Sequence, residues 1–214
     1  MKIDWNGFDL ELLQGRAIHW ARQDTLFVAD PHFGKAATFR SLGIPVPETA
    51  SRATCDRLSV LLNQTKARRL VFLGDFLHAR EGRTDRVRED LCAWREGHDG
   101  VTMDLVLGNH DLAAGYPWKE LRINVHPDPW DLAGLACRHK PQEEPVFPSL
   151  SGHLHPVACP FGRRNSSGLS RPCFWIRPME IVLPAFGEFT GGHQVRGEAG
   201  DRLVLLGDES LVEL

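Results

Sequence analysis

The stretch Val101-Thr-Met-Asp-Leu-Val-Leu-Gly-Asn-His-Asp111 decides the fold. Its first part is a short, mostly apolar run that is followed by a glycine, a pattern consistent with a buried strand. Directly after the run come Gly108, Asn109, His110 and Asp111. The stretch therefore predicts a buried strand that ends in a polar cluster able to carry chemistry.

Two earlier stretches repeat this design. The run 25–29 leads into Asp30-Pro-His32, and the run 69–73 leads into Gly74-Asp75. Between the three runs, apolar residues recur at helical spacing in 48–66 and 84–96. Strands that alternate with helices form parallel βαβ units, whose ligands bind outside the carboxyl ends of the strands. We therefore expect an α/β fold with the active site at those ends.

The second half of the chain has a different sequence pattern. It contains no long amphipathic helix, and its apolar runs are short and β-like, at 123–125, 135–137, 173–176, 180–183 and 203–206. Two more strands are expected near the start, at 10–13 and 16–20. The segment 160–172 is rich in Gly, Ser, Arg and Pro and predicts an exposed loop. No internal repeat divides the chain, so we expect a single domain over residues 1–214.

Charge and composition narrow the function classes. The net charge is -3, which excludes a basic field over the whole protein, although a local basic patch stays open. No apolar run approaches the ~20 residues that a membrane helix needs, and the start of the chain lacks the layout of a secretory signal. The five cysteines are scattered and form no CxxC pair. We expect free thiols and a cytoplasmic protein without a membrane partner.

Five polar clusters carry metal-binding residue types. They are Asp30-Pro-His32, Gly74-Asp75, Gly108-Asn-His-Asp111, His139 and Gly152-His-Leu-His155. Imidazole nitrogens and carboxylate oxygens bind divalent transition metals. Residues two apart in an extended chain point the same way, so each Asp-x-His or His-x-His pair can face one site. The glycines allow the backbone to approach closely where a side chain would crowd the site.

The clusters differ in how specific they are. Asp-x-His and Gly-Asp alone are often plain turns, whereas Gly-Asn-His-Asp after a buried strand is far more specific. His139 has the weakest local signal, and His126 competes with it. We prefer His139 because it follows an apolar run and precedes the last cluster at a fitting distance. The remaining histidines, His19, His98 and His193, are interpreted as surface or structural residues.

The ordered motifs D-x-H, GD, GNHD, H and GHxH resemble the signature of the calcineurin-like metallophosphoesterase superfamily over residues 25–156. The resemblance implies a four-layer αββα sandwich of two mixed sheets flanked by helices. It also implies two divalent cations that share Asp75. The ligands of one cation would be Asp30, His32, Asp75 and His155, and those of the other Asp75, Asn109, His139 and His153. His110 would contact the phosphate or protonate the leaving group, and Asp111 would orient His110.

The second motif departs from the superfamily pattern. Many members continue GD with another acid or with Asn-Arg, whereas this chain reads Gly-Asp-Phe-Leu-His78. His78 is therefore a candidate for the rim of the site. We also regard Lys35 and Arg40 as candidate substrate contacts. Arg163, Arg164 and Arg171 could contact nucleic acid, although each alone is more often a solvated charge.

A narrower resemblance concerns the segments 30–35, 39–40, 43–47 and 74–78. They are similar to the bacterial DNA ligase-associated metallophosphoesterases, whose genes often neighbour a DNA ligase and a helicase. This resemblance implies a phosphodiesterase that processes DNA ends in repair, in functional association with those enzymes. We expect manganese as the metal, with Fe, Zn, Ni and Mg left open.

Two other functions stay open. The enzyme could act on a phosphomonoester or a small nucleotide instead of a DNA end. The chain could also be a catalytically silent scaffold of the same fold, although the presence of all the ligand types and of His110 argues against this. A metal-dependent hydrolysis assay with a generic phosphodiester separates the enzymes from the scaffold. A comparison of a diester with a monoester of the same leaving group separates the two enzymes.

Overall fold

The computed structural model describes residues 1–47, 49–160 and 170–214, and its first half forms a seven-stranded sheet. The strands run side by side in chain order. They are β1 (Lys2–Trp5), β2 (Phe8–Leu13), β3 (Ala17–Trp20), β4 (Thr25–Val28), β5 (Arg69–Leu73), β6 (Thr102–Val106) and β7 (Ile123–His126). Strands β1 to β4 pair antiparallel, whereas β4 to β7 pair parallel, so the three predicted strand-end clusters lie at one edge.

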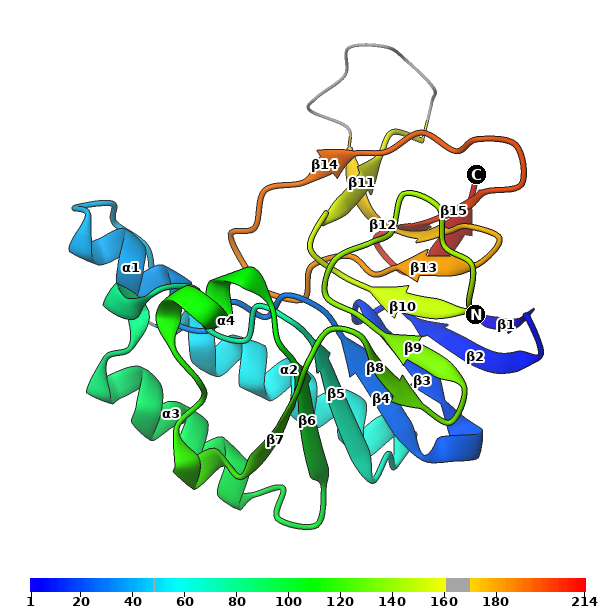
Figure 1. Cartoon of the computed structure of the whole chain (residues 1–214). Coiled ribbons are helices and arrows are strands. Elements are labelled where there is room, and N and C mark those ends of the chain that lie inside the picture. Colours follow the sequence, from blue (N-terminus) through cyan, green and yellow to red (C-terminus); the bar gives the residue numbers. More distant parts are fainter. Residues whose placement is uncertain (48, 161–169) are drawn as a thin grey trace.

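Helices cover one face of this sheet (Figure 1). They are α1 (Lys35–Ser41), α2 (Ala50–Thr65), α3 (Asp85–Glu96) and α4 (Asn109–Ala114), with 3-10 turns at Ala21–Gln23, Arg80–Gly82 and Lys119–Leu121. The predicted helix at 84–96 is present, and the Thr84 hydroxyl caps it by accepting a hydrogen bond from the Val87 amide at 3.3 Å. The predicted helix at 48–66 corresponds to α2; residue 48 itself lies outside the described residues.

The central strands bury both faces, which explains their continuous apolar runs. In β5, Leu70 and Phe72 pack against α2 and α3, whereas Val71 and Leu73 pack against the second sheet. This period-two alternation places one core between the helices and the first sheet and a second core between the two sheets. The strand ends are thereby held firmly on both sides.

The second sheet has nine strands and stacks on the first. They are β8 (Trp130–Leu132), β9 (Leu135–Cys137), β10 (Ser149–Ser151), β11 (Pro156–Ala158), β12 (Arg171–Ile176), β13 (Glu180–Val182), β14 (His193–Gln194), β15 (Arg202–Leu206) and β16 (Leu211–Glu213). The order is β14-β11-β12-β13-β10-β9-β8, with β15 beside β12 and β16 beside β15. Strand β10 pairs parallel with β9 and with β13, so the sheet is mixed.

The predicted α/β fold, with two mixed sheets and flanking helices, is confirmed. It differs from the four-layer expectation in one respect: the described part of the chain after residue 121 contains no helix, so the helices flank the first sheet only. The sequence had already indicated short strands rather than helices there. Most of the expected loop at 160–172 lies outside the described residues, and the single domain stays a prediction. No described helix is long and apolar enough to span a bilayer.

Candidate metal centre

The five polar clusters meet where the carboxyl ends of strands from both sheets come together. Asp30, Asp75 and Asn109 follow β4, β5 and β6 of the first sheet, and His139 and His153 follow β9 and β10 of the second. Because β9 and β10 are parallel to each other, their carboxyl ends also lie at one edge. The structure therefore brings all the predicted metal ligands into one connected group.

The backbone at these ends is left-handed rather than extended. Positive φ angles occur at Asp30 (51°), His32 (47°), Asp75 (50°), His153 (68°) and His155 (51°). The extended-chain geometry that we expected for Asp-x-His and His-x-His is therefore wrong. Each left-handed residue costs roughly 1 kcal/mol, and such strain collects at functional sites. Asp and His tolerate this conformation better than most residues, which suits them to these turns.

One donor group consists of Asp30, His32 and His155, whose ligand atoms all lie within 4.8 Å of one another. His155 Nε2 lies 3.7 Å from Asp30 Oδ2 and 3.4 Å from His32 Nε2. Two neutral imidazole nitrogens that face each other can form at most one hydrogen bond, so a shared cation satisfies them better. These residues are three of the four ligands predicted for the first cation, and Asp75 is the fourth.

A second donor group consists of Asp75, His139 and His153, again within 4.8 Å. His139 Nε2 lies 3.4 Å from Asp75 Oδ1, 3.1 Å from His153 Nδ1 and 2.9 Å from Asn109 Oδ1. The two groups touch, because Asp75 Oδ2 lies 3.9 Å from His32 Nε2. Asp75 thus faces one group with each carboxylate oxygen, as a bridging ligand would.

Backbone carbonyls orient two of the imidazoles. His139 Nδ1 lies 3.2 Å from the carbonyl oxygen of Leu73, and His155 Nδ1 lies 3.2 Å from that of Gly191. Each contact places the ring proton on Nδ1 and leaves the lone pair on Nε2, which points into the donor group. These carbonyls have no side-chain signature, so sequence reasoning could not find them.

The electrostatics of the centre fit a cation. Burial raises the pKa of Asp30 well above its ordinary value, and the charge of Asp75 raises it further. Burial also lowers the pKa of His155 to about 4 and lowers the pKa values of His139 and His153. The imidazoles are therefore neutral at pH 7 with lone pairs available, beside a buried carboxyl whose Oδ1 has no hydrogen-bond partner among the described residues. A divalent cation resolves both features.

Two glycines allow the backbone to pass close to ligands. A Cβ on Gly74, whose φ is +82°, would lie 2.0 Å from His139 Nδ1. A Cβ on Gly108 would lie 2.2 Å from Asp75 Oδ1. Any side chain at either position would displace a ligand, as the sequence predicted for the glycines at the rim.

His110 lies in the first turn of α4 with its ring turned toward the centre. Its backbone amide donates a 2.9 Å hydrogen bond to Asp75 Oδ1, and its Nε2 lies 3.9 Å from Asp75 Oδ2. We expected Asp111 to orient His110, but Asp111 instead accepts hydrogen bonds from the amides of Leu77 and Gly108 at 3.1 and 3.0 Å. The contact at His110 Nδ1 is with the carbonyl oxygen of His78, at 2.6 Å. Asp111 therefore holds the two strand-end loops together.

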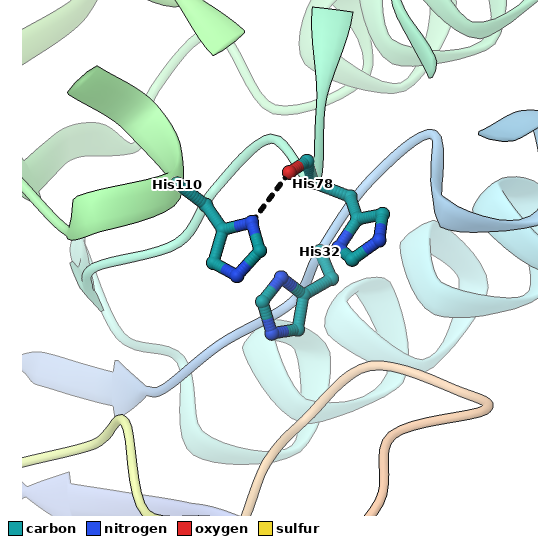
Figure 2. A group of neighbouring side chains, drawn as sticks. All are labelled: His32, His78 and His110. Atoms are coloured by element: carbon teal, nitrogen blue, oxygen red, sulfur yellow. Dashed lines mark hydrogen bonds between the residues drawn. The ribbon is translucent and has the colours of Figure 1, made fainter. Parts of the chain in front are cut away.

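His78 completes a third group of rings with His32 and His110 (Figure 2). The rings of His78 and His110 are stacked at 5.0 Å, and the ring of His32 stands edge-on to both. Burial lowers the pKa of His78 to about 4, so this ring is neutral at pH 7. His78 therefore lies next to His110, and its role at the rim of the site stays a prediction.

The other candidate substrate contacts, Lys35 and Arg40, both lie in α1. Lys35, the first residue of α1, is half-buried, and burial lowers its pKa while the charges of Asp30 and Asp75 oppose that shift. Arg40 donates hydrogen bonds to the carbonyls of Val46 and Pro47 at 3.4 and 3.3 Å, so it supports the loop after α1. Their role in substrate binding stays a prediction. Arg163 and Arg164 lie outside the described residues.

Comparison with known proteins places this geometry in a family. The crystal structure of Pseudomonas putida nuclease MPE is 40% identical and covers 100% of this chain and 99% of that chain, with a TM-score of 0.86. Yfce, a phosphoesterase from E. coli, is 17% identical, covers 89% of this chain and 97% of that chain, and has a TM-score of 0.41. No protein-family model and no curated protein matches the chain.

The 40% identity over the full length shows that this chain belongs to the metallophosphoesterase superfamily. As a member of that superfamily it is a phosphoric ester hydrolase. The His and Asp groups described above could hold metal ions, and they lie at the strand ends. Their roles as individual ligands stay a prediction.

Proposed function

We propose that this protein is a phosphodiesterase that uses two divalent cations to cut phosphodiester bonds in nucleic acid. The observation that carries the proposal is the pair of donor groups joined at Asp75, with Oδ1 toward His139 and Oδ2 toward His32. Two adjacent cation sites that share a carboxylate are the arrangement that clamps both oxygens of an in-line displacement at phosphorus.

The proposed ligands form two sets, one for each cation. Asp30, His32 and His155 would hold one cation, and Asn109, His139 and His153 the other, with Asp75 between them. Bound cations supply Lewis acidity, which acidifies water and neutralises charge on the phosphoryl oxygens. The left-handed backbone and the carbonyls of Leu73 and Gly191 fix the ligands before substrate arrives, so little reorganisation is needed.

His110 would move the proton. Its Nδ1 is held by the His78 carbonyl, so Nε2 is the atom that gains and donates a proton. A protonated Nε2 can pass its proton to the oxygen that leaves phosphorus, which is general acid catalysis. The stacked ring of His78 keeps the His110 ring from rotating away.

Several finer features are part of the proposal. Manganese is the proposed metal. The mixed imidazole and carboxylate donors are compatible with it, and they are also compatible with Fe, Zn or Ni. DNA is the proposed nucleic acid, supported by the similarity to a nuclease and by the narrower sequence resemblance. Action on DNA ends in repair, functional association with a DNA ligase and a helicase, and a cytoplasmic location follow from that resemblance alone.

The test is a metal-dependent hydrolysis assay. The protein is stripped with a chelator and reloaded with Mn²⁺, Zn²⁺, Ni²⁺ or Mg²⁺, and the hydrolysis of bis(4-nitrophenyl) phosphate is compared with that of 4-nitrophenyl phosphate. We expect faster hydrolysis of the diester, restored by two equivalents of metal. Faster hydrolysis of the monoester would favour a phosphomonoesterase, and hydrolysis of neither ester would favour a scaffold.

A further inference from the structure

Two connected pockets run away from the metal centre. The nearer one, of ≈ 110 Å³, is lined by His155, Arg16 and Pro172 among others, and the farther one, of ≈ 270 Å³, shares Arg16 and Pro172 with it. A ligand of the first cation site thus forms part of the wall at one end of this groove. The turn between β2 and β3 and the start of β12 line the farther pocket.

The farther pocket is lined by three arginines. Arg16, Arg57 and Arg171 line it together with neutral residues, and no acidic residue is among its described lining residues. Burial lowers the pKa of Arg57, the charge of Glu188 opposes that shift, and the charge of Arg16 adds to it by a smaller amount. Glu188 pairs with Arg57, and Asp208 pairs with Arg171. Three guanidinium groups beside two carboxylates leave a net positive charge at this pocket, which attracts phosphate.

Two of the arginines are fixed relative to the metal centre. Arg16 Nη1 donates to the carbonyl of Ala185 at 3.1 Å, and Arg57 donates to the carbonyl of Phe186 and pairs with Glu188. The next amide, of Gly187, donates a 3.1 Å hydrogen bond to the carbonyl of the proposed ligand Asp30. The basic pocket and the metal centre are therefore parts of one rigid frame.

The third arginine is available to a ligand. Arg171 Nη1 pairs with Asp208 Oδ1 at 2.9 Å, and their side chains are 51% and 80% exposed. Ion pairs this exposed contribute ~0–1 kcal/mol, because water and salt screen them. A phosphate offers the guanidinium two parallel hydrogen bonds, so it can displace the Asp208 carboxylate at little cost.

We propose that this basic pocket binds a backbone phosphate of the same nucleic-acid strand whose scissile phosphodiester occupies the metal centre. This inference rests on the proposed function and adds a second point of contact on the substrate. A small diester reaches only the metal centre, whereas an oligonucleotide also reaches Arg171 through the groove. The pocket therefore makes the enzyme prefer polymeric substrates over small diesters.

The test is Arg171→Glu, with Arg22→Glu as the matched control. Arg22 forms a similarly exposed ion pair, with Asp9 at 2.7 Å, and does not line either pocket. The KM for a single-stranded thymidine 12-mer and that for bis(4-nitrophenyl) phosphate are measured with Mn²⁺. We expect the ratio of the two KM values to rise about tenfold in Arg171→Glu, and an Arg171→Ala variant to lower the salt dependence of oligonucleotide binding by about one ion.

A second readout separates this inference from the proposed function. Fluorescence anisotropy measures binding of the labelled 12-mer to the metal-free protein, where turnover plays no part. Weaker binding in Arg171→Glu than in Arg22→Glu supports the pocket even if no diester is hydrolysed. Equal binding by the two variants, or an equal rise in their KM ratios, overturns the inference about the pocket. The proposed function would then still be tested separately, by the metal-dependent hydrolysis assay.

Discussion

The first sheet carries buried aspartates beside histidines in two places, and only one of them is suited to a metal. At the metal centre, Asp75 lies 3.4 Å from His139. In a second cluster, made of Arg69, Asp104, Asn124 and His126, the Asp104 carboxylate lies 2.7 Å from His126 Nε2. Both aspartates are almost completely buried, at 2% exposure each. Burial of an aspartate next to a histidine therefore does not by itself define a metal site.

The difference lies in what neutralises the carboxylate. Asp104 Oδ2 faces Arg69 Nε at 3.4 Å, and Asp104 Oδ1 accepts a hydrogen bond from Asn124 Nδ2 at 3.2 Å, so the Asp104 cluster contains its own cation and donors. His126 is stacked on Trp130 at 4.0 Å, which holds its ring against Asp104 rather than in either donor group. At the metal centre, Asp30 and Asp75 contact imidazoles and backbone amides, and no described arginine or lysine forms an ion pair with either carboxylate. A bound cation would supply the positive charge that Arg69 supplies to Asp104.

The largest difference in activity between two variants is expected for Asp75→Asn and Asp104→Asn. Asp75→Asn removes the charge that joins both donor groups, so we expect diester hydrolysis to fall by at least about a thousandfold, since the cations supply several kcal/mol. Asp104→Asn keeps the activity close to that of the wild type but lowers the free energy of unfolding by ~1–3 kcal/mol, because it weakens a buried polar cluster. Hydrolysis of bis(4-nitrophenyl) phosphate and urea unfolding measure the two effects.

The metal content of the variants is the control, measured by elemental analysis. Asp75→Asn should hold less metal than the wild type, and Asp104→Asn the same amount. If Asp104→Asn lost metal as readily as Asp75→Asn, the distinction between the two clusters would be false.

A smaller contrast is expected between His110→Ala and His126→Ala. His110 holds no cation in our proposal, so its removal should lower kcat by about 10²- to 10³-fold, the usual range for a general acid, while the metal stays bound. His126→Ala should leave kcat near that of the wild type. Loss of metal from a folded His110→Ala variant would show that His110 is a ligand rather than the acid.

Much of the fold could be predicted from the sequence, because buried parallel strands need unbroken apolar runs. The runs at 25–29, 69–73 and 101–107 became β4, β5 and β6 with small changes at their ends. The short helices α1 and α4 were missed. Each begins directly at a site motif and is only a turn or two long, so its hydrophobic periodicity is too short to detect.

Less of the site could be predicted, because contacts between distant segments leave no local pattern. The ligand types and their order were readable, and the structure brings the preferred His139 into the centre while His126 lies in the Asp104 cluster. The left-handed turns, the carbonyls that fix the imidazoles and the true contact of His110 Nδ1 were not readable. The basic pocket joins Arg16, Arg57 and Arg171 from three distant segments, and only folding brings them together.

The smallest difference is expected in the Mn²⁺ affinity of two glycine variants, Gly74→Ala and Gly100→Ala. A Cβ at position 74 would lie 2.0 Å from His139 Nδ1 and break its contact with the Leu73 carbonyl, whereas a Cβ at position 100 would meet nothing within 4 Å. Loss of an orienting contact costs about 10–100-fold in metal affinity, and we expect Gly74→Ala to bind Mn²⁺ that much more weakly. Gly100→Ala should bind it as the wild type does. A Mn²⁺ titration of activity measures the shift. If both variants need the same Mn²⁺ concentration, the metal centre tolerates a displaced His139, and the close packing of Gly74 against that ring is not what positions the ligand.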